Sequence, residues 1–182
     1  YPREVQVLIT DDQTERTSLL INALHQQGIQ VSIIHFGENG NSAGGIPSED
    51  GLHHFNLEHA DENSVRKLMD KILAKNKKMV AFIHLNPPSH KNDSKLLDVS
   101  GANAEILKSI FLIARHLKKP LSEMAETTRA AFLTVTQMDG QFGLNGYSYN
   151  DPLPGGFPGL TKSLQKEWGN IFCRAVDIHP QI

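Results

Sequence analysis

The segment GGFPGLTKSLQKEWGNIFCRAVDI, residues 155–178, joins a helical pattern to a short apolar run. We expect a helix over residues 155–168 and a strand over residues 170–178. A helix that leads into a buried strand is part of the repeating unit from which parallel sheets are built. The rest of the chain repeats this unit, and the repetition decides the fold class.

Five further runs have the composition of short strands, and helical patterns separate most of them. Apolar residues recur at helical spacing from Leu19 to Leu24, and again from Val65 to Leu73 after a start near Asp61. The helix expected from Ala104 to Leu117 is apolar around a wide arc, so we expect it to be buried on more than one side. The alternation predicts an α/β fold: a truncated, Rossmann-like, doubly wound parallel sheet of about six strands with helices on both faces. The five runs are residues 5–9, 29–36, 53–57, 79–85 and 130–136.

Length and composition favour a single domain. A chain of 182 residues with 39% apolar and 21% charged residues has the balance of one globular unit, residues 1–182. Two polar stretches near residues 37–52 and 86–102 have no periodicity, so we expect long loops there. The chain begins with Tyr1 and stops soon after the sixth expected strand, which we interpret as a piece of a longer protein.

Charge and cysteine content exclude several classes of partner. The formal net charge of -2 gives no broad basic field for nucleic acid or an anionic membrane. The single cysteine, Cys173, stands in an apolar stretch, which predicts a buried thiol in a reducing compartment. No apolar run approaches the roughly 20 residues of a membrane span. We therefore expect a cytoplasmic protein.

The junction between the first strand and the first helix reads VLITDDQTERTSLLINAL, residues 7–24. A dinucleotide-binding fold needs glycines at this corner so that backbone amides can approach a pyrophosphate. Here Thr10, Asp11, Asp12 and Gln13 occupy it, and the first glycine is Gly28. Their side chains would block a pyrophosphate and two carboxylates would repel it, so we expect no cofactor site here. Asp12, placed with Glu15 like a capping box, is expected to cap the helix.

An acid pair after the first strand is also typical of response-regulator receiver domains, which hold a magnesium ion there. Lys119 and Pro120 are similar to the lysine-proline pair of that family. Lys119 nevertheless follows a helical run instead of ending a strand, and Glu58 is the only acid near the end of the third strand. The receiver interpretation is the weakest of the alternatives.

The C-terminal segments resemble the short-chain dehydrogenase/reductase family. GGFPGLTKSLQKEW and NIFCRAVDI are similar to its helix and following strand, and TQMDGQFG is similar to the end of its fifth strand. Counting back from Gly140, the resemblance places Gln137 at the position of the catalytic serine. It places Asn150 at the catalytic tyrosine and Pro154 at the catalytic lysine.

The chemistry that the family implies at these positions is missing. The family's tyrosine donates a proton to the carbonyl, its lysine lowers the tyrosine pKa and binds ribose, and its serine orients the substrate. Asn150 cannot donate such a proton, and Pro154 has no ammonium group to lower a pKa or bind ribose. Tyr149 is a neighbouring candidate, but Leu153 stands four residues beyond it and the next lysine is Lys162. The family's asparagine-alanine-glycine signature after the fourth strand is replaced by HLNPP, residues 84–88.

A reductase pattern without a reductase site resembles the N-terminal structural subdomain of ketoreductase domains in polyketide synthases and polyunsaturated fatty acid synthases. In those enzymes only the second, catalytic subdomain binds NADPH and reduces the β-ketoacyl group. The resemblance implies that this chain is not an enzyme by itself, that it binds no cofactor, and that it braces the catalytic half. The alternative is a divergent reductase-like protein that still binds a nucleotide, as an enzyme or a sensor. The segments that carry the likeness are FIHLNP, FLTVTQMDGQFG, GGFPGLTKSLQKEW and FCRAVDI.

The resemblance also implies a surface for the partner. Reductases of this family pair through the helices beside the fifth strand, here Ala104 to Leu117 and Gly155 to Trp168. Three glycines, Gly155, Gly156 and Gly159, are expected to leave one helix face flat for close approach. The alternative is that these helices only cover their own sheet, with Trp168 packed against it.

Two clusters invite other interpretations. His53, His54 and His59 suggest a metal, but adjacent residues of a strand point to opposite faces, so we expect no metal site. A basic turn is expected to be a solvated helix end, and docking of an acidic acyl carrier protein there is the alternative. The turn contains Lys75, Lys77 and Lys78.

Overall fold

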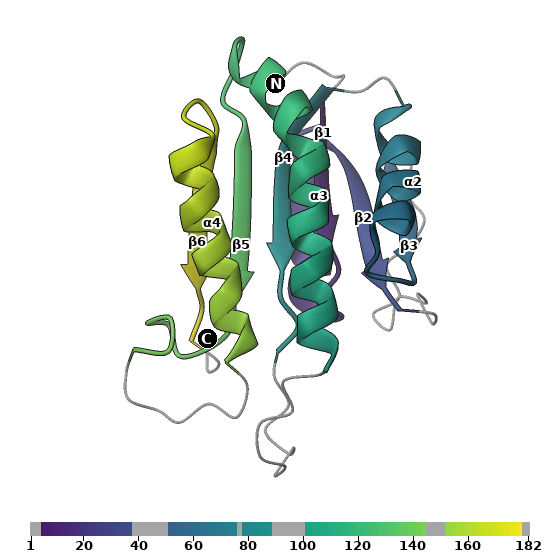
Figure 1. The fold of residues 1–182 in the computed structure, drawn as a ribbon. Coiled ribbons are helices and arrows are strands. Elements are labelled where there is room, and N and C mark those ends of the chain that lie inside the picture. Colours follow the sequence, from purple (N-terminus) through teal and green to yellow (C-terminus); the bar gives the residue numbers. More distant parts are fainter. Residues whose placement is uncertain (1–4, 38–50, 76–77, 89–100, 145–151, 180–182) are drawn as a thin grey trace.

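A computed structural model of the chain describes residues 5–37, 51–75, 78–88, 101–144 and 152–179. Six strands form one sheet in the order β3-β2-β1-β4-β5-β6, and every neighbouring pair is parallel (Figure 1). The strands are β1 (Val5–Thr10), β2 (Gln30–Phe36), β3 (Leu52–Leu57), β4 (Lys78–Leu85), β5 (Ala131–Thr136) and β6 (Phe172–Asp177).

The strand order identifies the type of sheet. It is the order of dinucleotide-binding folds, in which the chain direction across the sheet reverses between β1 and β4. The predicted fold class is therefore confirmed. Receiver domains have the order 2-1-3-4-5, so the receiver interpretation is wrong. Lys119 stands in a helix and its side chain is exposed.

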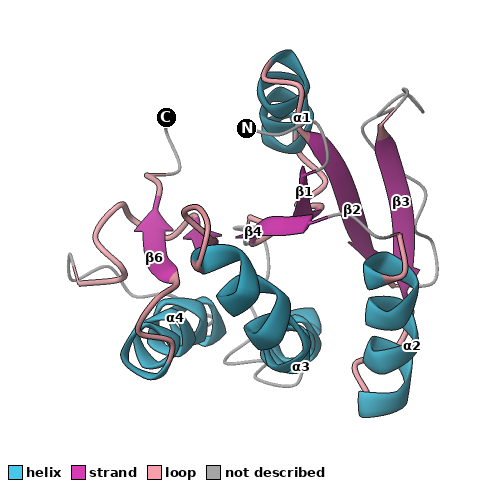
Figure 2. Ribbon diagram, turned by 90° about the horizontal axis from the view of Figure 1, so that it is seen from above, coloured by secondary structure: helices cyan, strands magenta, loops and turns pink. Residues whose placement is uncertain are grey.

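Four helices cover the sheet unevenly. Of the described helices, Figure 2 shows α1 on one face, over the β1–β3 half, while α2, α3 and α4 lie on the other. The crossovers explain this arrangement, because right-handed connections place helices on opposite faces as the chain moves outward in opposite directions from β1. The helices are α1 (Glu15–Gln26), α2 (Glu62–Leu73), α3 (Ala102–Ala125) and α4 (Gly156–Glu167), and a 3-10 turn, η1 (Leu153–Gly155), precedes α4.

Two helix boundaries differ from the sequence prediction. Helix α1 is capped by Thr14 instead of Asp12, because Gln13 adopts a left-handed backbone with φ of 59° that delays the helix. Helix α3 continues through Pro120 to Ala125. Proline removes one backbone hydrogen bond, but the extra turn buries Leu121 and Met124 and so offsets that loss. The predicted start of α2 is correct, since Asp61 caps it.

The core lies mainly between the sheet and the three helices of the crowded face. Phe132 of β5 packs against Phe82 of β4 and edge-on against Trp168, so the predicted position of Trp168 is confirmed. Cys173 is buried beside this cluster, and burial raises the pKa of its thiol to about 11. Among the described residues no helix is long and apolar enough to cross a membrane.

Candidate functional site

The corner between β1 and α1 is filled by hydrogen bonds within the chain. The Gln13 N–H donates to a carboxylate oxygen of Asp11 at 2.8 Å, and the Thr14 N–H donates to Asp12 at 3.0 Å. The Asp12 N–H donates to the hydroxyl of Thr17, and the Arg16 N–H donates to that of Thr14. Three of these amides precede α1 and one lies in its first turn, the region where a phosphate binds at a helix N-terminus. Carboxylates and hydroxyls of the chain itself already occupy them.

Asp12 is fixed firmly in this position. Its side chain is 1% exposed and forms an ion pair with Arg16 at 3.0 Å. It also accepts hydrogen bonds from the hydroxyls of Thr14 and Thr17, at 2.7 and 2.8 Å. A carboxylate at the positive end of a helix is stabilised by the helix dipole. Asp12 therefore supplies the negative charge that this corner would otherwise draw from a phosphate.

Side chains near the crevice between β1 and β4 bond to each other. Ligands of this fold bind at the carboxyl ends of the strands, where the strand order reverses. There the hydroxyl of Thr10 bonds to Nδ1 of His84 at 2.9 Å and accepts the Leu85 N–H at 3.0 Å. The His84 ring is fully buried, lies 4.4 Å from the Phe157 ring between centroids, and has its pKa lowered by burial to about 3. A neutral imidazole thus packs beneath α4 near the reversal point.

Asp11, just after β1, and one histidine each from β2 and β3 form a hydrogen-bonded chain that sequence reasoning missed. A carboxylate oxygen of Asp11 lies 2.9 Å from Nδ1 of His35, and Nε2 of His35 lies 2.9 Å from Nδ1 of His54. The two rings stack with centroids 5.2 Å apart. Burial alone would raise the Asp11 pKa, but the hydrogen bonds from His35 and Gln13 outweigh it and lower that pKa. Asp11 is therefore a structural anion for β2 and β3.

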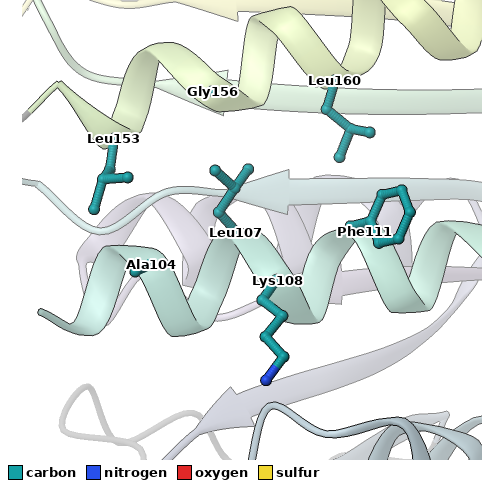
Figure 3. A pocket seen from close by; sticks show the side chains of 7 residues that line it. All are labelled: Ala104, Leu107, Lys108, Phe111, Leu153, Gly156 and Leu160. Carbon is teal, nitrogen blue, oxygen red and sulfur yellow. The ribbon is translucent and has the colours of Figure 1, made fainter. Parts of the chain in front are cut away.

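The surface of α3 and α4 carries an open apolar hollow of 420 Å³ (Figure 3). Phe111 of α3 and Leu160 of α4 line it, and the Phe111 side chain is 51% exposed. Gly156 lies so close to α3 that an added Cβ would come within 2.6 Å of Leu107. Of the three glycines predicted to flatten α4, Gly156 thus serves packing within the chain. Gly155 and Gly159 have open space where a side chain would stand.

The comparisons with known proteins agree with this fold. No known family model matches the chain, and no curated protein is similar to it in sequence. A 3-ketoacyl-(acyl-carrier-protein) reductase from Brucella melitensis, solved with NADH, matches 94% of this chain over 73% of its own length, with a TM-score of 0.72 and 19% identity. The chain has the fold of a short-chain reductase.

Two further solved structures have the same fold. An apo SCOR enzyme from Clostridium thermocellum matches 93% of this chain and 69% of its own, with a TM-score of 0.68 and 15% identity. A citronellol catabolism dehydrogenase from Pseudomonas aeruginosa matches 94% of this chain over 72% of its own length, with a TM-score of 0.67 and 18% identity. Identities this low establish the short-chain reductase fold and leave activity to be argued from the site.

Two of the three catalytic positions of the short-chain reductase pattern lie in the described residues. Gln137 is half-buried in the loop after β5, and Pro154 is buried in the η1 turn. Asn150, Tyr147 and Tyr149 lie outside the described residues. Glutamine and proline supply neither a proton donor nor a cation at these two positions.

The loop that carries Gln137 is held by Asp177 at the end of β6. The Asp177 carboxylate accepts the N–H groups of Met138, Asp139 and Phe142 at 2.8, 3.2 and 2.9 Å. It also accepts the hydroxyl of Thr136 at 2.8 Å. This anchor fixes the loop after β5 to the end of β6.

The remaining predicted clusters are the three histidines and the basic turn. Within the described ranges no group of three His, Cys, Asp or Glu side chains is arranged to hold a metal ion. His54 faces His35, and burial together with the neighbouring His35 lowers the His54 pKa. Lys75 lies over the ring of Phe55 at 5.1 Å, which covers part of the basic turn. Lys77 lies outside the described residues.

Proposed function

We propose that the chain is a non-catalytic module that braces the NADPH-binding catalytic half of a β-ketoacyl reductase in a polyketide or polyunsaturated fatty acid synthase. Such a module would act in the cytoplasm with its synthase and would bind no cofactor itself. The observation that carries the proposal is the occupation of the α1 N-terminus by Asp11, Asp12 and Thr14. The fold of a short-chain reductase is present, and four backbone amides at this corner already donate to side chains of the chain, which supports the proposal.

Charge and space both oppose a dinucleotide at this corner. A pyrophosphate would have to displace the buried Asp12 from Arg16 and from two hydroxyls, and Asp11 from His35. Leaving buried donors unpaired costs about 1–3 kcal/mol each, and more for charged groups. Two carboxylates close to a pyrophosphate add repulsion. We therefore infer that the corner stabilises the fold and does not bind NADPH.

The bracing surface that we propose is the exposed flank of α3 and α4. Phe111 stands half-exposed beside a hollow lined by Leu107 and Leu160, and Figure 3 shows Phe111 and Leu160 facing each other across it. Large apolar patches on otherwise polar surfaces mark protein interfaces. The partner we propose is the equivalent helix pair of a reductase domain with the same fold, because two such pairs present similar apolar shapes to each other.

Co-expression with the catalytic half of a polyketide synthase ketoreductase tests the bracing role. We expect the two proteins to co-purify and the catalytic half to gain solubility and NADPH-dependent reduction of a β-ketoacyl thioester. Phe111→Asp should abolish co-purification, since it places a charge in the centre of the apolar surface.

Leu19→Ser is the matched control, because Leu19 is 60% exposed on the opposite face of the sheet. It should co-purify like the unchanged chain. Equal co-purification of the Phe111→Asp chain would contradict the proposed surface, and an active, soluble catalytic half without this chain would contradict the bracing role.

A further inference from the structure

Two histidines join the outermost strand β3 to its neighbour β2 through their rings. Nε2 of His35 lies 2.9 Å from Nδ1 of His54, and the two rings are parallel, with 4° between their planes. On the other side of His35, Nδ1 lies 2.9 Å from the Asp11 carboxylate, and both of these side chains are buried. Nε2 of His54 is also shielded from solvent and has no hydrogen-bond partner in the described part of the chain. The bonded groups are therefore a carboxylate and two imidazoles in series.

The distance between the two rings limits the number of protons that they can hold. Two nitrogens 2.9 Å apart share one hydrogen, which either ring can donate. With one added proton the pair stays joined, because His35 still donates to Asp11 and one hydrogen still lies between the rings. With two added protons, an N–H group of each ring points at the other, and repulsion between two cations replaces the hydrogen bond.

The neighbouring charges favour a first proton and oppose a second. Burial would raise the Asp11 pKa, but the hydrogen bonds from His35 and Gln13 lower it, so the carboxylate stays charged beside His35. Burial of His54 and, after it, the neighbouring His35 lower the His54 pKa from its ordinary value of 6.5. The joined pair therefore takes its second proton only below pH 6.5.

Few other charges act on this pair. The elements around it are the end of β1, helix α1, β3 and the turn after β3, while α2 lies on the other face of the sheet. From α1, the hydroxyl of Thr17 bonds to Asp11. Asp12 and Arg16 pair with each other, and among the described residues only His53 acts on His54 besides the members of the chain, more weakly than they do. The other charged or titratable side chains on these elements are Asp12, Glu15, Arg16, His25, His53, Glu58 and His59.

The position of β3 decides what this repulsion would move. In the described sheet β3 is the last strand of the order and pairs with β2, whereas β5 stands between β4 and β6. The β2–β3 ladder runs from the pair Val31 and Leu52 to the pair Phe36 and Leu57, and the two histidines lie within it. A strand at the end of a sheet can separate while the other strands stay together, because local opening breaks only its own contacts.

We propose that His35 and His54, anchored on Asp11, form an acid-sensitive latch that holds β3 to β2 with at most one added proton and releases β3 when both rings are charged. In acid the β3 edge would then loosen before the rest of the fold. The latch lies on the α1 face of the sheet, opposite α3 and α4. It is therefore independent of the bracing surface.

Hydrogen exchange of single backbone amides at pH 7.5 and 5.0 tests the latch. Protection factors remove the pH dependence of the intrinsic exchange rate, and β5 reports global unfolding, including the part that comes from His84. We expect the protection of β3 relative to β5 to fall about tenfold or more. The reason is that a proton bound only in the open state changes the opening equilibrium about tenfold per pH unit below 6.5.

Two variants and the ring spectra make the test specific. His54→Asn keeps a side-chain N–H for His35 but cannot be charged, so its ratio of β3 to β5 protection should stay constant. His59→Gln removes an exposed histidine and should show the fall of the unchanged chain. Nitrogen-15 spectra of the imidazole rings in the unchanged chain should show both rings charged only below pH 6.5.

Three results would overturn the latch. The first is a parallel loss of protection in β3 and β5, and the second is a fall that persists in the His54→Asn chain. The third is a pair of charged rings with unchanged protection of β3. The first and third are measured on the unchanged chain, so they decide the question even if the His54→Asn chain does not fold.

Discussion

The hydroxyl of Thr10 lies 2.9 Å from Nδ1 of His84, and this bond joins β1 to β4 where the strand order of the sheet reverses. The same hydroxyl accepts the N–H of Leu85. In this fold the reversal point is where a ligand normally enters. Here the bond holds two strands together.

Thr10→Val should test the strength of this bond. Valine has nearly the same shape but leaves the Leu85 N–H and the His84 ring without their partner. We expect the free energy of unfolding to fall by about 1–3 kcal/mol, the cost of leaving a buried polar group unsatisfied. Urea denaturation at pH 7.5 measures it. Thr127→Val, at an exposed threonine whose hydroxyl donates to the helix-end carbonyl of Met124, is the control and should cost less.

Burial of His84 predicts a pH dependence of stability. Its pKa of about 3 in the folded chain lies below the value of about 6.5 in the unfolded chain, so the unfolded state binds the proton more tightly. The contribution of His84 to the free energy of unfolding is therefore fully present above pH 6.5. It falls as the pH drops toward 3, by about 1.4 kcal/mol per pH unit. Thermal unfolding between pH 7.5 and 5 should show this fall.

The variant His84→Leu should flatten that profile, although His54, whose pKa is also lowered, keeps part of the slope. His59→Gln removes an exposed histidine and should leave the slope as it was. A His84→Leu chain with an unchanged slope would show that His84 is already protonated in the folded state at those pH values.

Two glycines of α4 provide a matched pair. Gly156→Ala places a methyl group 2.6 Å from Leu107 and should lower the free energy of unfolding by about 1 kcal/mol as that side chain moves. Gly159→Ala meets open space inside the helix and should raise it by about 0.5–1 kcal/mol. Urea denaturation compares the two variants. Similar effects of both would contradict the close packing of α3 on α4.

The sequence predicts the elements of the fold well, because apolar periodicity reflects burial directly. All six strands and four helices stand where residues such as Leu68, Ile110 and Phe132 indicate them. The cap at Thr14 was not predictable in this way, because it depends on a left-handed Gln13 that no composition rule identifies.

Contacts between strands are harder to predict than the strands themselves. Asp11, His35 and His54 meet because the register of β1, β2 and β3 brings one face of each together. A one-residue shift in register would separate them. The acid and the two histidines at strand positions were visible in the sequence, but their pairing was not.

The face of β4 to β6 that no described helix covers was also missed, for a different reason. Leu133, Val135 and Val176 are apolar residues in strands that read as buried, and the pattern of a strand does not tell whether a helix is available to cover it. The strand order and the positions of the described helices are both needed to see that none of these helices covers this face.

An NADPH fluorescence titration of the chain tests the central claim most directly, with an active 3-ketoacyl reductase as the positive control. The amides of Gln13 and Thr14 already donate to the carboxylates of Asp11 and Asp12, so we predict no saturable binding up to millimolar cofactor. Saturable binding in the micromolar range would mean that a pyrophosphate displaces both carboxylates. The chain would then be a divergent nucleotide-binding reductase, and its role as a structural brace would be contradicted.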